Sequence, residues 1–210
     1  MVDGVIVNSL NIGAEAYAEM GLSLVGIDCD LGEASVQIAS DSYSIGELAT
    51  RRLIDDGCSR ILCLRSNSRM RMPANKRTDA YLDVVEQAGL SALVREVEFV
   101  KPDDEKGAVV AKILDENPDI DGIFAGDDTM AAICLNVMKQ RGLSAPDDIK
   151  VVGADGARRT MTFMPDLTTV RQDIDRIGEL AAQSIIALIN GEKPESNIKL
   201  PVELIEGKTA

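Results

Sequence analysis

The sequence predicts an α/β fold with parallel sheets, because short apolar stretches alternate along the chain with longer stretches of helical period. Most of the short stretches are nearly continuous in apolar residues, as expected for strands covered on both faces. A chain of 210 residues with 45% hydrophobic residues can bury a core of this kind. Strands are expected at 3–7, 22–28, 36–40, 60–64, 96–100, 121–126, 149–154 and 167–170.

Four helices are expected from apolar side chains that recur at helical spacing. These stripes run from Ile45 to Leu53, Tyr81 to Ala88, Met130 to Met138 and Ile177 to Ile189. A glycine stands just past each stripe, where a residue of left-handed conformation can end a helix without a Cβ penalty. The four glycines are Gly57, Gly89, Gly142 and Gly191.

Composition excludes several classes of function. A formal net charge of −13 opposes contact with a phosphate backbone, so this chain alone is not expected to bind nucleic acid. The sequence has no histidine, which removes Ser-His-Asp and Cys-His catalysis and most zinc sites. No apolar run approaches the roughly 18 residues that span a bilayer, and the start lacks signal-peptide features. A cytoplasmic protein without a membrane partner is therefore expected.

Neither the cysteines nor the carboxylates indicate a metal or cofactor site. The cysteines Cys29, Cys58, Cys63 and Cys134 form no CxxC pair, and three of them lie in apolar patterns. Buried free thiols are favoured over a redox or metal role. The pair Asp127 and Asp128 does not match a calcium loop, and no GxGxxG or P-loop motif is present. No metal and no cofactor are predicted.

Polar side chains follow five of the predicted strands. In open parallel sheets, ligands bind beyond the carboxyl ends of the strands, so these residues are candidates for one binding rim. The candidates are Asp41, the basic loop with Arg69, Arg71, Lys76 and Arg77, then Asp127 with Asp128, Asp155, and finally Arg171, Gln172 and Asp173.

Structural explanations stand beside this functional one. Asp41 and Asp128 can cap the helices that follow them. The basic loop can be solvated surface, and Asp155 between two glycines can belong to a plain turn. A glycosidase pair of Asp127 and Asp155 also stays open, because the distance between two carboxylates, rather than their sequence spacing, decides that chemistry.

The order and spacing of the segments resemble the regulatory core of the LacI family of transcription regulators over nearly the whole chain. The segments are DGVIV, LSLVGID, VQIASDSYSIGELATRRLIDDGCSRILCL, KRTDAYLDVVEQAG, DIDGIFAGDDTMAAICLNVMKQRGLSAPDDIKVVGADG and PDLTTVRQDIDRIGELAAQSIIALINGE. The resemblance implies a two-lobed periplasmic-binding-protein-like fold, with a parallel sheet in each lobe and an effector in the cleft between the lobes. It places residues 1–57 plus 171–197 in a partial N-terminal lobe, and 58–170 plus 198–210 in the C-terminal lobe.

The same resemblance assigns effector-binding roles to six positions. They are Asp41, Arg71, Arg77, Asp127, Asp155 and Gln172. Asp127 stands where sugar-responsive members often have Asn, a change that removes a donor and adds charge. This change argues against a standard neutral sugar. It favours an amine ligand, a metal-bridged ligand or a protonated Asp127. Gly156 and Cys58 also depart from the family pattern, and we interpret both as scaffold drift.

The resemblance further implies a DNA-binding helix-turn-helix and hinge of about 60 residues, followed by two βα units, before the strand at 3–7. These segments do not occur in this sequence, so operator DNA is expected to be bound only through a domain outside it. The strand at 3–7 would then have an unpaired apolar edge. A fragment, a gene start drawn too late, and an edge filled by a partner molecule are the three explanations.

The expected function is therefore the effector-sensing and dimerisation core of a LacI-type repressor. It is expected to act as a homodimer and to bind a sugar or sugar-like ligand without being an enzyme. The alternative is a sugar-binding protein of a transport system, which resembles the same two-lobed fold. A carboxylate-based hydrolase ranks third, because no pair of nucleophile and base is visible.

Overall fold

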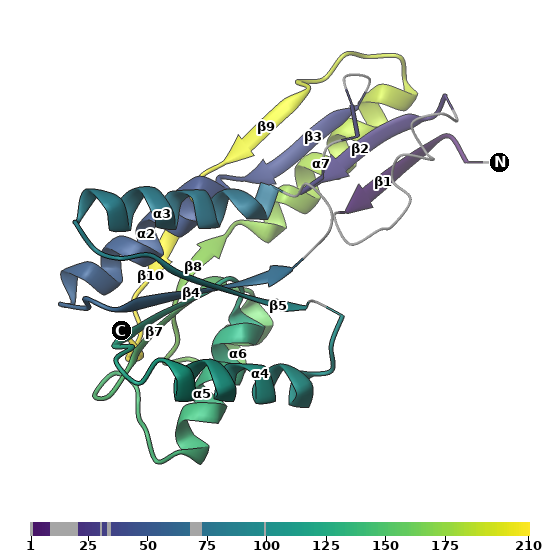
Figure 1. The fold of residues 1–210 in the computed structure, drawn as a ribbon. Coiled ribbons are helices and arrows are strands. Elements are labelled where there is room, and N and C mark those ends of the chain that lie inside the picture. Colours follow the sequence, from purple (N-terminus) through teal and green to yellow (C-terminus); the bar gives the residue numbers. More distant parts are fainter. Residues whose placement is uncertain (1, 9–20, 30, 33–34, 68–72, 99) are drawn as a thin grey trace. The chain divides into compact units, whose positions relative to one another are not determined.

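The chain forms two compact units. Figure 1 shows the computed structural model, which describes residues 2–8, 21–29, 31–32, 35–67, 73–98 and 100–210. The first unit comprises Met1–Ser42, Arg71–Ala74 and Asp173–Pro201, and the second comprises Tyr43–Met70, Asn75–Gln172 and Val202–Ala210. The first boundary thus comes before Tyr43, earlier than the one that the resemblance implied after Gly57.

The first unit is a parallel sheet with one long helix. Its strands are β1 (Gly4–Asn8), β2 (Ser23–Ile27), β3 (Val36–Ser40) and β9 (Asn197–Leu200), in the order β1-β2-β3-β9. Each neighbouring pair is parallel. Helix α7 (Ile174–Ile189) packs on this sheet through Ile177 and Ala181, which join Val25, Val36 and Ile38 in one buried cluster. Within the described residues, β1 is an edge strand.

The second unit is a six-stranded sheet in the order β10-β8-β7-β6-β4-β5. Its strands are β4 (Ile61–Asn67), β5 (Leu93–Glu98), β6 (Gly122–Ala125), β7 (Lys150–Asp155), β8 (Thr168–Gln172) and β10 (Val202–Ile205). All neighbours are parallel except β10, which runs antiparallel to β8. Because five strands are parallel, their carboxyl ends lie at one edge of the sheet.

Helices cover both faces of this second sheet (Figure 1). On one face, α2 (Ser42–Asp55) and α3 (Lys76–Gln87) bury Ile45, Leu53 and Tyr81 against the strands. On the other face, α4 (Asp103–Glu116) and α5 (Asp128–Gln140) bury Val110 and Cys134. A 3₁₀ turn (Pro73–Asn75) precedes α3, and the short helix α6 (Arg158–Phe163) follows β7. Because α2 packs on this sheet from Ile45 onward, it belongs to the second unit rather than to the first.

Each predicted strand and helix is present, with shifted ends and some additions. The strand expected at 96–100 lies at Leu93–Glu98, since Leu93 and Val97 are the side chains that the core buries, whereas Val100 is 85% exposed. Strands β9 and β10 and helices α4 and α6 were not predicted. The two strands are four residues each and none of their side chains is fully buried, so they have no continuous apolar run.

The glycines and cysteines mostly behave as predicted. Gly57, Gly89, Gly142 and Gly191 have positive φ, from +69° to +87°, at or just past the ends of helices. All four cysteines are free thiols, and Cys58, Cys63 and Cys134 are buried while Cys29 is partly buried. Burial raises the pKa of Cys63 and of Cys134 to about 12, so both remain protonated. Among the described helices, none is long and apolar enough to cross a bilayer.

Candidate functional site

Four of the six predicted effector-binding residues lie at the carboxyl edge of the second sheet. Asp127 follows β6, Asp155 ends β7, and Gln172 ends β8. Arg77 stands in the first turn of α3, the helix reached by the connection from β4. The parallel direction of these strands brings together residues that are far apart in the sequence.

The centre of this edge is a hydrogen-bonded cluster of Arg77, Asp155 and Gln172. Arg77 Nη2 donates to Asp155 Oδ1 at 3.0 Å, and Gln172 Nε2 donates to the same oxygen at 2.6 Å. Arg77 Nη1 donates to the carbonyl oxygen of Gly126, which follows β6. The Arg77 side chain is only 12% exposed. The guanidinium is therefore held in one orientation by groups from two strand ends.

Two local features of the chain place Arg77 and Asp155. A Cβ at Gly46 would collide with the Arg77 carbonyl, so a glycine in α2 allows the start of α3 to come close. Asp155, the last residue of β7, has φ +110°, and Gly156 has φ +58°, so the strand ends in a turn with two positive φ angles. Such a conformation is unfavourable for Asp, which has a Cβ, and persists only where surrounding contacts stabilise it.

The electrostatics of Asp155 reflect opposing neighbours. Burial raises the pKa of this carboxyl, and the negative charge of Asp127 raises it as well. The Arg77 guanidinium and the hydrogen bond from Gln172 act in the opposite direction. Among the described residues, both hydrogen bonds to Asp155 end on Oδ1. Oδ2 can therefore accept a hydrogen bond from a ligand.

Asp127 is the N-cap of α5. Its Oδ1 accepts from the backbone N–H of Met130 at 2.8 Å, and its Oδ2 lies 3.4 Å from the Ser66 hydroxyl. The capping role that was one of the expectations for Asp128 therefore belongs to Asp127. One oxygen of Asp127 is used by the helix, which also weakens a glycosidase pair of Asp127 and Asp155.

Asp128 has a role that sequence reasoning missed. This residue is 3% exposed, and its carboxylate accepts hydrogen bonds from the Gly156 backbone N–H at 2.8 Å and from the Thr169 hydroxyl at 2.6 Å. Asp128 thus links α5 to the turn after β7 and to Thr169 in β8. No pattern in the sequence separates it from its neighbour Asp127, because both follow the same strand.

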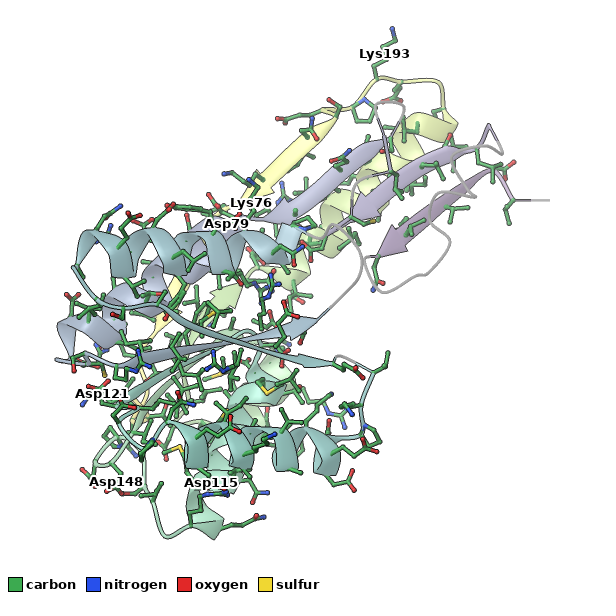
Figure 2. All side chains as sticks on the ribbon, in the orientation of Figure 1. Lys76, Asp79, Asp115, Asp121, Asp148 and Lys193 are labelled. Carbon is green, nitrogen blue, oxygen red and sulfur yellow. The ribbon has the colours of Figure 1, made fainter. Side chains whose placement is uncertain are left out.

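The other two predicted effector-binding residues are Asp41 and Arg71. Asp41 belongs to the first unit, where it pairs with Lys199 at 2.9 Å. Arg69 and Arg71 lie outside the described residues. Of the other two residues of the basic loop, Lys76 is exposed on α3 near Asp79, as Figure 2 shows, and Arg77 is the cluster residue. Among the described residues, no group of three or more His, Cys, Asp or Glu could hold a metal ion.

Comparison with known proteins identifies the family. Residues 50–210 match the periplasmic binding protein-like domain. The chain belongs to this family. It is 32% identical to the sucrose operon repressor of Pediococcus pentosaceus, over 100% of this chain and 64% of that protein. It is 30% identical to the ribose operon repressor of Halalkalibacterium halodurans, over 99% of this chain and 62% of that protein.

Solved structures of regulators share the fold. A transcriptional regulator CelR in complex with cellobiose aligns with a TM-score of 0.88 and 28% identity, over 100% of this chain and 66% of that one. A LacI-family regulator from Arthrobacter sp. FB24 in complex with lactose aligns with a TM-score of 0.86 and 26% identity, over 100% and 79%. The predicted resemblance to the LacI family and its periplasmic-binding-protein-like fold is confirmed.

The matched relatives are longer than this chain and are named as repressors. The chain spans less than two thirds of the length of the sucrose and ribose operon repressors that it matches. Those relatives are transcriptional repressors rather than enzymes, so the hydrolase alternative is set aside.

Proposed function

We propose that this chain is the effector-sensing part of a LacI-type transcriptional repressor and binds a sugar through Arg77, Asp127, Asp155 and Gln172. The observation that supports this most directly is the Arg77–Asp155–Gln172 cluster at the carboxyl edge of the second sheet. Sugar hydroxyls both donate and accept hydrogen bonds. A fixed guanidinium beside a carboxylate with an available oxygen offers both functions to adjacent hydroxyls.

A second feature of Arg77 agrees with a ligand at this edge. Its Nε is buried and has no hydrogen-bond partner among the described residues. A buried donor without a partner is unfavourable by about 1–3 kcal/mol, so the guanidinium keeps hydrogen-bonding capacity that the described part of the chain does not use. Asp41 and Arg71 stay predicted effector contacts, to be tested with the same measurements.

The names of the relatives favour a regulator over the transport-type alternative. The matched proteins are operon repressors, and the aligned regulators were solved with cellobiose and with lactose. A ligand of this kind would control the repressor only through its different affinity for two conformations. Cytoplasmic location follows from this role, since the operator is there.

DNA binding and assembly are further parts of the proposal. With a net charge of −13, these 210 residues are not suited to bind operator DNA, so we assign that contact to a helix-turn-helix outside them. We expect a homodimer, as the LacI resemblance implies. Sedimentation equilibrium should give twice the mass of the chain, and a monomer across micromolar concentrations would contradict the dimer.

The proposed function is tested by ligand screening with the 210-residue chain. Thermal unfolding is followed with sucrose, D-ribose, cellobiose and lactose, and then with sugar phosphates, nucleobases and polyamines. A sugar present at 100 times its Kd should stabilise the chain by about 2.7 kcal/mol. Titration calorimetry then gives the affinity. If no sugar shifts the transition while an amine or nucleobase does, the sugar assignment is wrong.

A further inference from the structure

A buried carboxylate links three elements beneath the candidate site. Asp128, in the first turn of α5, is 3% exposed. Its Oδ2 accepts from the Gly156 N–H at 2.8 Å, and its Oδ1 accepts from the Thr169 hydroxyl at 2.6 Å. Gly156 follows β7 and Thr169 is the second residue of β8, so one side chain joins a helix start to the turn after β7 and to the neighbouring strand β8.

The surroundings leave room for this carboxylate. A Cβ at Gly153 in β7 would lie 2.6 Å from Asp128 Oδ1 and 3.3 Å from Thr169 Oγ1. A larger residue there would displace the carboxylate. Burying a carboxylate is unfavourable unless its oxygens accept hydrogen bonds. Here a glycine supplies the space, and a hydroxyl and a backbone N–H supply the donors.

The backbone N–H that Asp128 accepts belongs to the strained turn of the site. It is part of the peptide that joins Asp155, with φ +110°, to Gly156, with φ +58°. Rotation about the N–Cα bond of Asp155 toward a negative φ would displace this peptide and break the hydrogen bond to Asp128. The same rotation would move the Asp155 side chain, whose Oδ1 accepts from Arg77 and Gln172. The orientation of Asp155 therefore depends on Asp128, although its own hydrogen bonds among the described residues are to Arg77 and Gln172.

We propose that Asp128 is a positioning residue of the sugar site. By holding the Gly156 N–H it keeps the Asp155–Gly156 turn in its left-handed conformation, and it thereby aligns Asp155 with Arg77 and Gln172 for the ligand. This inference rests on the proposed function as far as the ligand is concerned. The effect on the turn itself does not depend on any ligand.

The charges around Asp128 agree with a role beyond stability. Burial raises the pKa of Asp128 to about 6, and the Asp155 and Asp127 carboxylates raise it as well, while the hydrogen bonds from Thr169 and Gly156 lower it. Arg77, the cation of the neighbouring cluster, forms its ion pair with Asp155. A carboxylate kept in such surroundings is costly for folding, which favours a role in the site.

The first test measures the turn in the 210-residue chain without ligand. Amide hydrogen exchange at Gly156 is compared in the wild type, Asp128→Ala and Asp128→Asn. The Ala variant lacks an acceptor, and exchange should become at least about 10-fold faster. The Asn variant keeps one oxygen for Gly156 and can donate from Nδ2 to Thr169, so its exchange should stay within about 3-fold of the wild type.

Asp121→Ala is the matched control. Asp121 accepts from the Ser59 and Arg60 backbone N–H groups and from the Ser59 hydroxyl, all at 2.8–2.9 Å. It comes directly before β6, at the opposite end from Asp128, and Figure 2 labels it. Asp121→Ala, like Asp128→Ala, loses a hydrogen-bonded carboxylate and should destabilise the chain. It should nevertheless leave amide exchange at Gly156 unchanged under native conditions.

The second test measures sugar binding. The sugar used is the one of sucrose, D-ribose, cellobiose and lactose that binds the wild type most tightly. Asp128→Ala should lower its affinity at least about 10-fold, whereas Asp128→Asn and Asp121→Ala should bind within about 3-fold of the wild type. If Asp128→Ala does not fold, Thr169→Val serves in its place. It removes the donor to Oδ1 and should speed Gly156 exchange and weaken the sugar.

The outcomes separate the two proposals. If no sugar of the panel binds the wild type, the proposed function fails, and Gly156 exchange still decides whether Asp128 holds the turn. If a sugar binds and Asp128→Ala keeps both wild-type affinity and wild-type exchange at Gly156, the positioning role is overturned. Faster exchange with unchanged affinity would also overturn it, because the turn would then not serve the site.

Discussion

Arg77 and Asp155, 78 positions apart in the sequence, form an ion pair of 3.0 Å at the carboxyl edge of the second sheet. The pair is fixed further by Gly126 on the arginine side and by Gln172 on the aspartate side. An arginine held in this way is arranged to meet a polar ligand without losing side-chain freedom on binding.

Arg77→Ala should therefore strongly reduce the thermal shift produced by a bound sugar. Removal of one partner of a charged pair typically costs 2–5 kcal/mol of binding, so the affinity should fall at least about 30-fold. Arg77→Lys keeps the charge without the planar fork and should bind with intermediate affinity. Titration calorimetry measures all three proteins.

Arg141→Ala is the control for this prediction. Arg141 also donates to a backbone carbonyl, that of Ala111, and to a carboxylate, that of Asp115, which Figure 2 labels. It joins α4 to the end of α5 and lies outside the cluster. Sugar affinity should be unchanged in this variant. Loss of binding in both variants would point to a general effect on folding rather than to a role of Arg77 at the site.

The pH dependence of stability should contain a contribution from Asp128. Its pKa of about 6 in the folded chain lies above the ordinary value of 3.8, so the folded state holds this proton more tightly than the unfolded state. The stabilisation is complete below about pH 4 and is lost as the pH rises through 6. The difference is of the order of 3 kcal/mol. Urea unfolding followed by circular dichroism from pH 4 to 7.5 measures it.

Asp128→Asn should show a flatter profile than the wild type over this range, because the amide does not titrate. Asp148→Asn is a comparison variant, because Asp148 contributes to stability with the opposite pH dependence. Hydrogen bonds from the Ser144 backbone and hydroxyl lower the pKa of Asp148, which Figure 2 labels, so its contribution is present at neutral pH and is lost in acid. Identical profiles for the wild type and Asp128→Asn would show that Asp128 does not titrate as expected.

Gly156→Ala should destabilise the chain more than Gly142→Ala. Both glycines have positive φ, +58° and +73°, so each alanine carries a conformational cost of about 1 kcal/mol. A Cβ at Gly156 would also lie 2.8 Å from the Arg171 Cα, whereas a Cβ at Gly142 meets nothing within 4 Å. The added clash should cost about 1–3 kcal/mol more by urea unfolding. Equal costs would contradict the close approach.

Tyr81→Phe should destabilise the second unit. The buried Tyr81 hydroxyl donates to the Ile61 carbonyl at 2.7 Å and accepts from the Leu93 N–H at 2.8 Å, so it joins the start of β4 to the start of β5. Its removal leaves two buried backbone groups without this partner, at a cost of about 1–3 kcal/mol. Tyr43→Phe removes an exposed hydroxyl that donates to Asp83 and should leave urea unfolding unchanged within error.

Local patterns were enough to predict the main elements of this fold. Apolar runs mark strands and apolar stripes mark helices, because burial acts on side chains at fixed spacing. Glycines mark helix ends, because the residue just past a helix often has a positive φ and glycine adopts it without a Cβ penalty. The same rules missed β9 and β10, whose four-residue strands are stabilised by pairing with β3 and β8 rather than by an apolar run of their own.

The candidate site was predicted in part. The sequence placed Arg77, Asp127, Asp155 and Gln172 at strand ends or at the helix start after one, and a parallel sheet brings such positions to one edge. It could not say which carboxylate would cap α5 and which would be buried. Asp127 and Asp128 are adjacent and identical in chemistry, and only the tertiary neighbours Met130, Gly156 and Thr169 distinguish them.

The sequence by itself thus determined the fold class, the family resemblance and the edge of the sheet at which Arg77 and Asp155 lie. The tertiary structure alone decided that these two residues form a pair, that Gln172 shares the same oxygen, and that Asp128 accepts from the Gly156 N–H of the adjoining turn. The reason is physical. Periodicity records how each segment meets the core, whereas a hydrogen bond between distant strands depends on distances and angles that exist only once the sheet has formed.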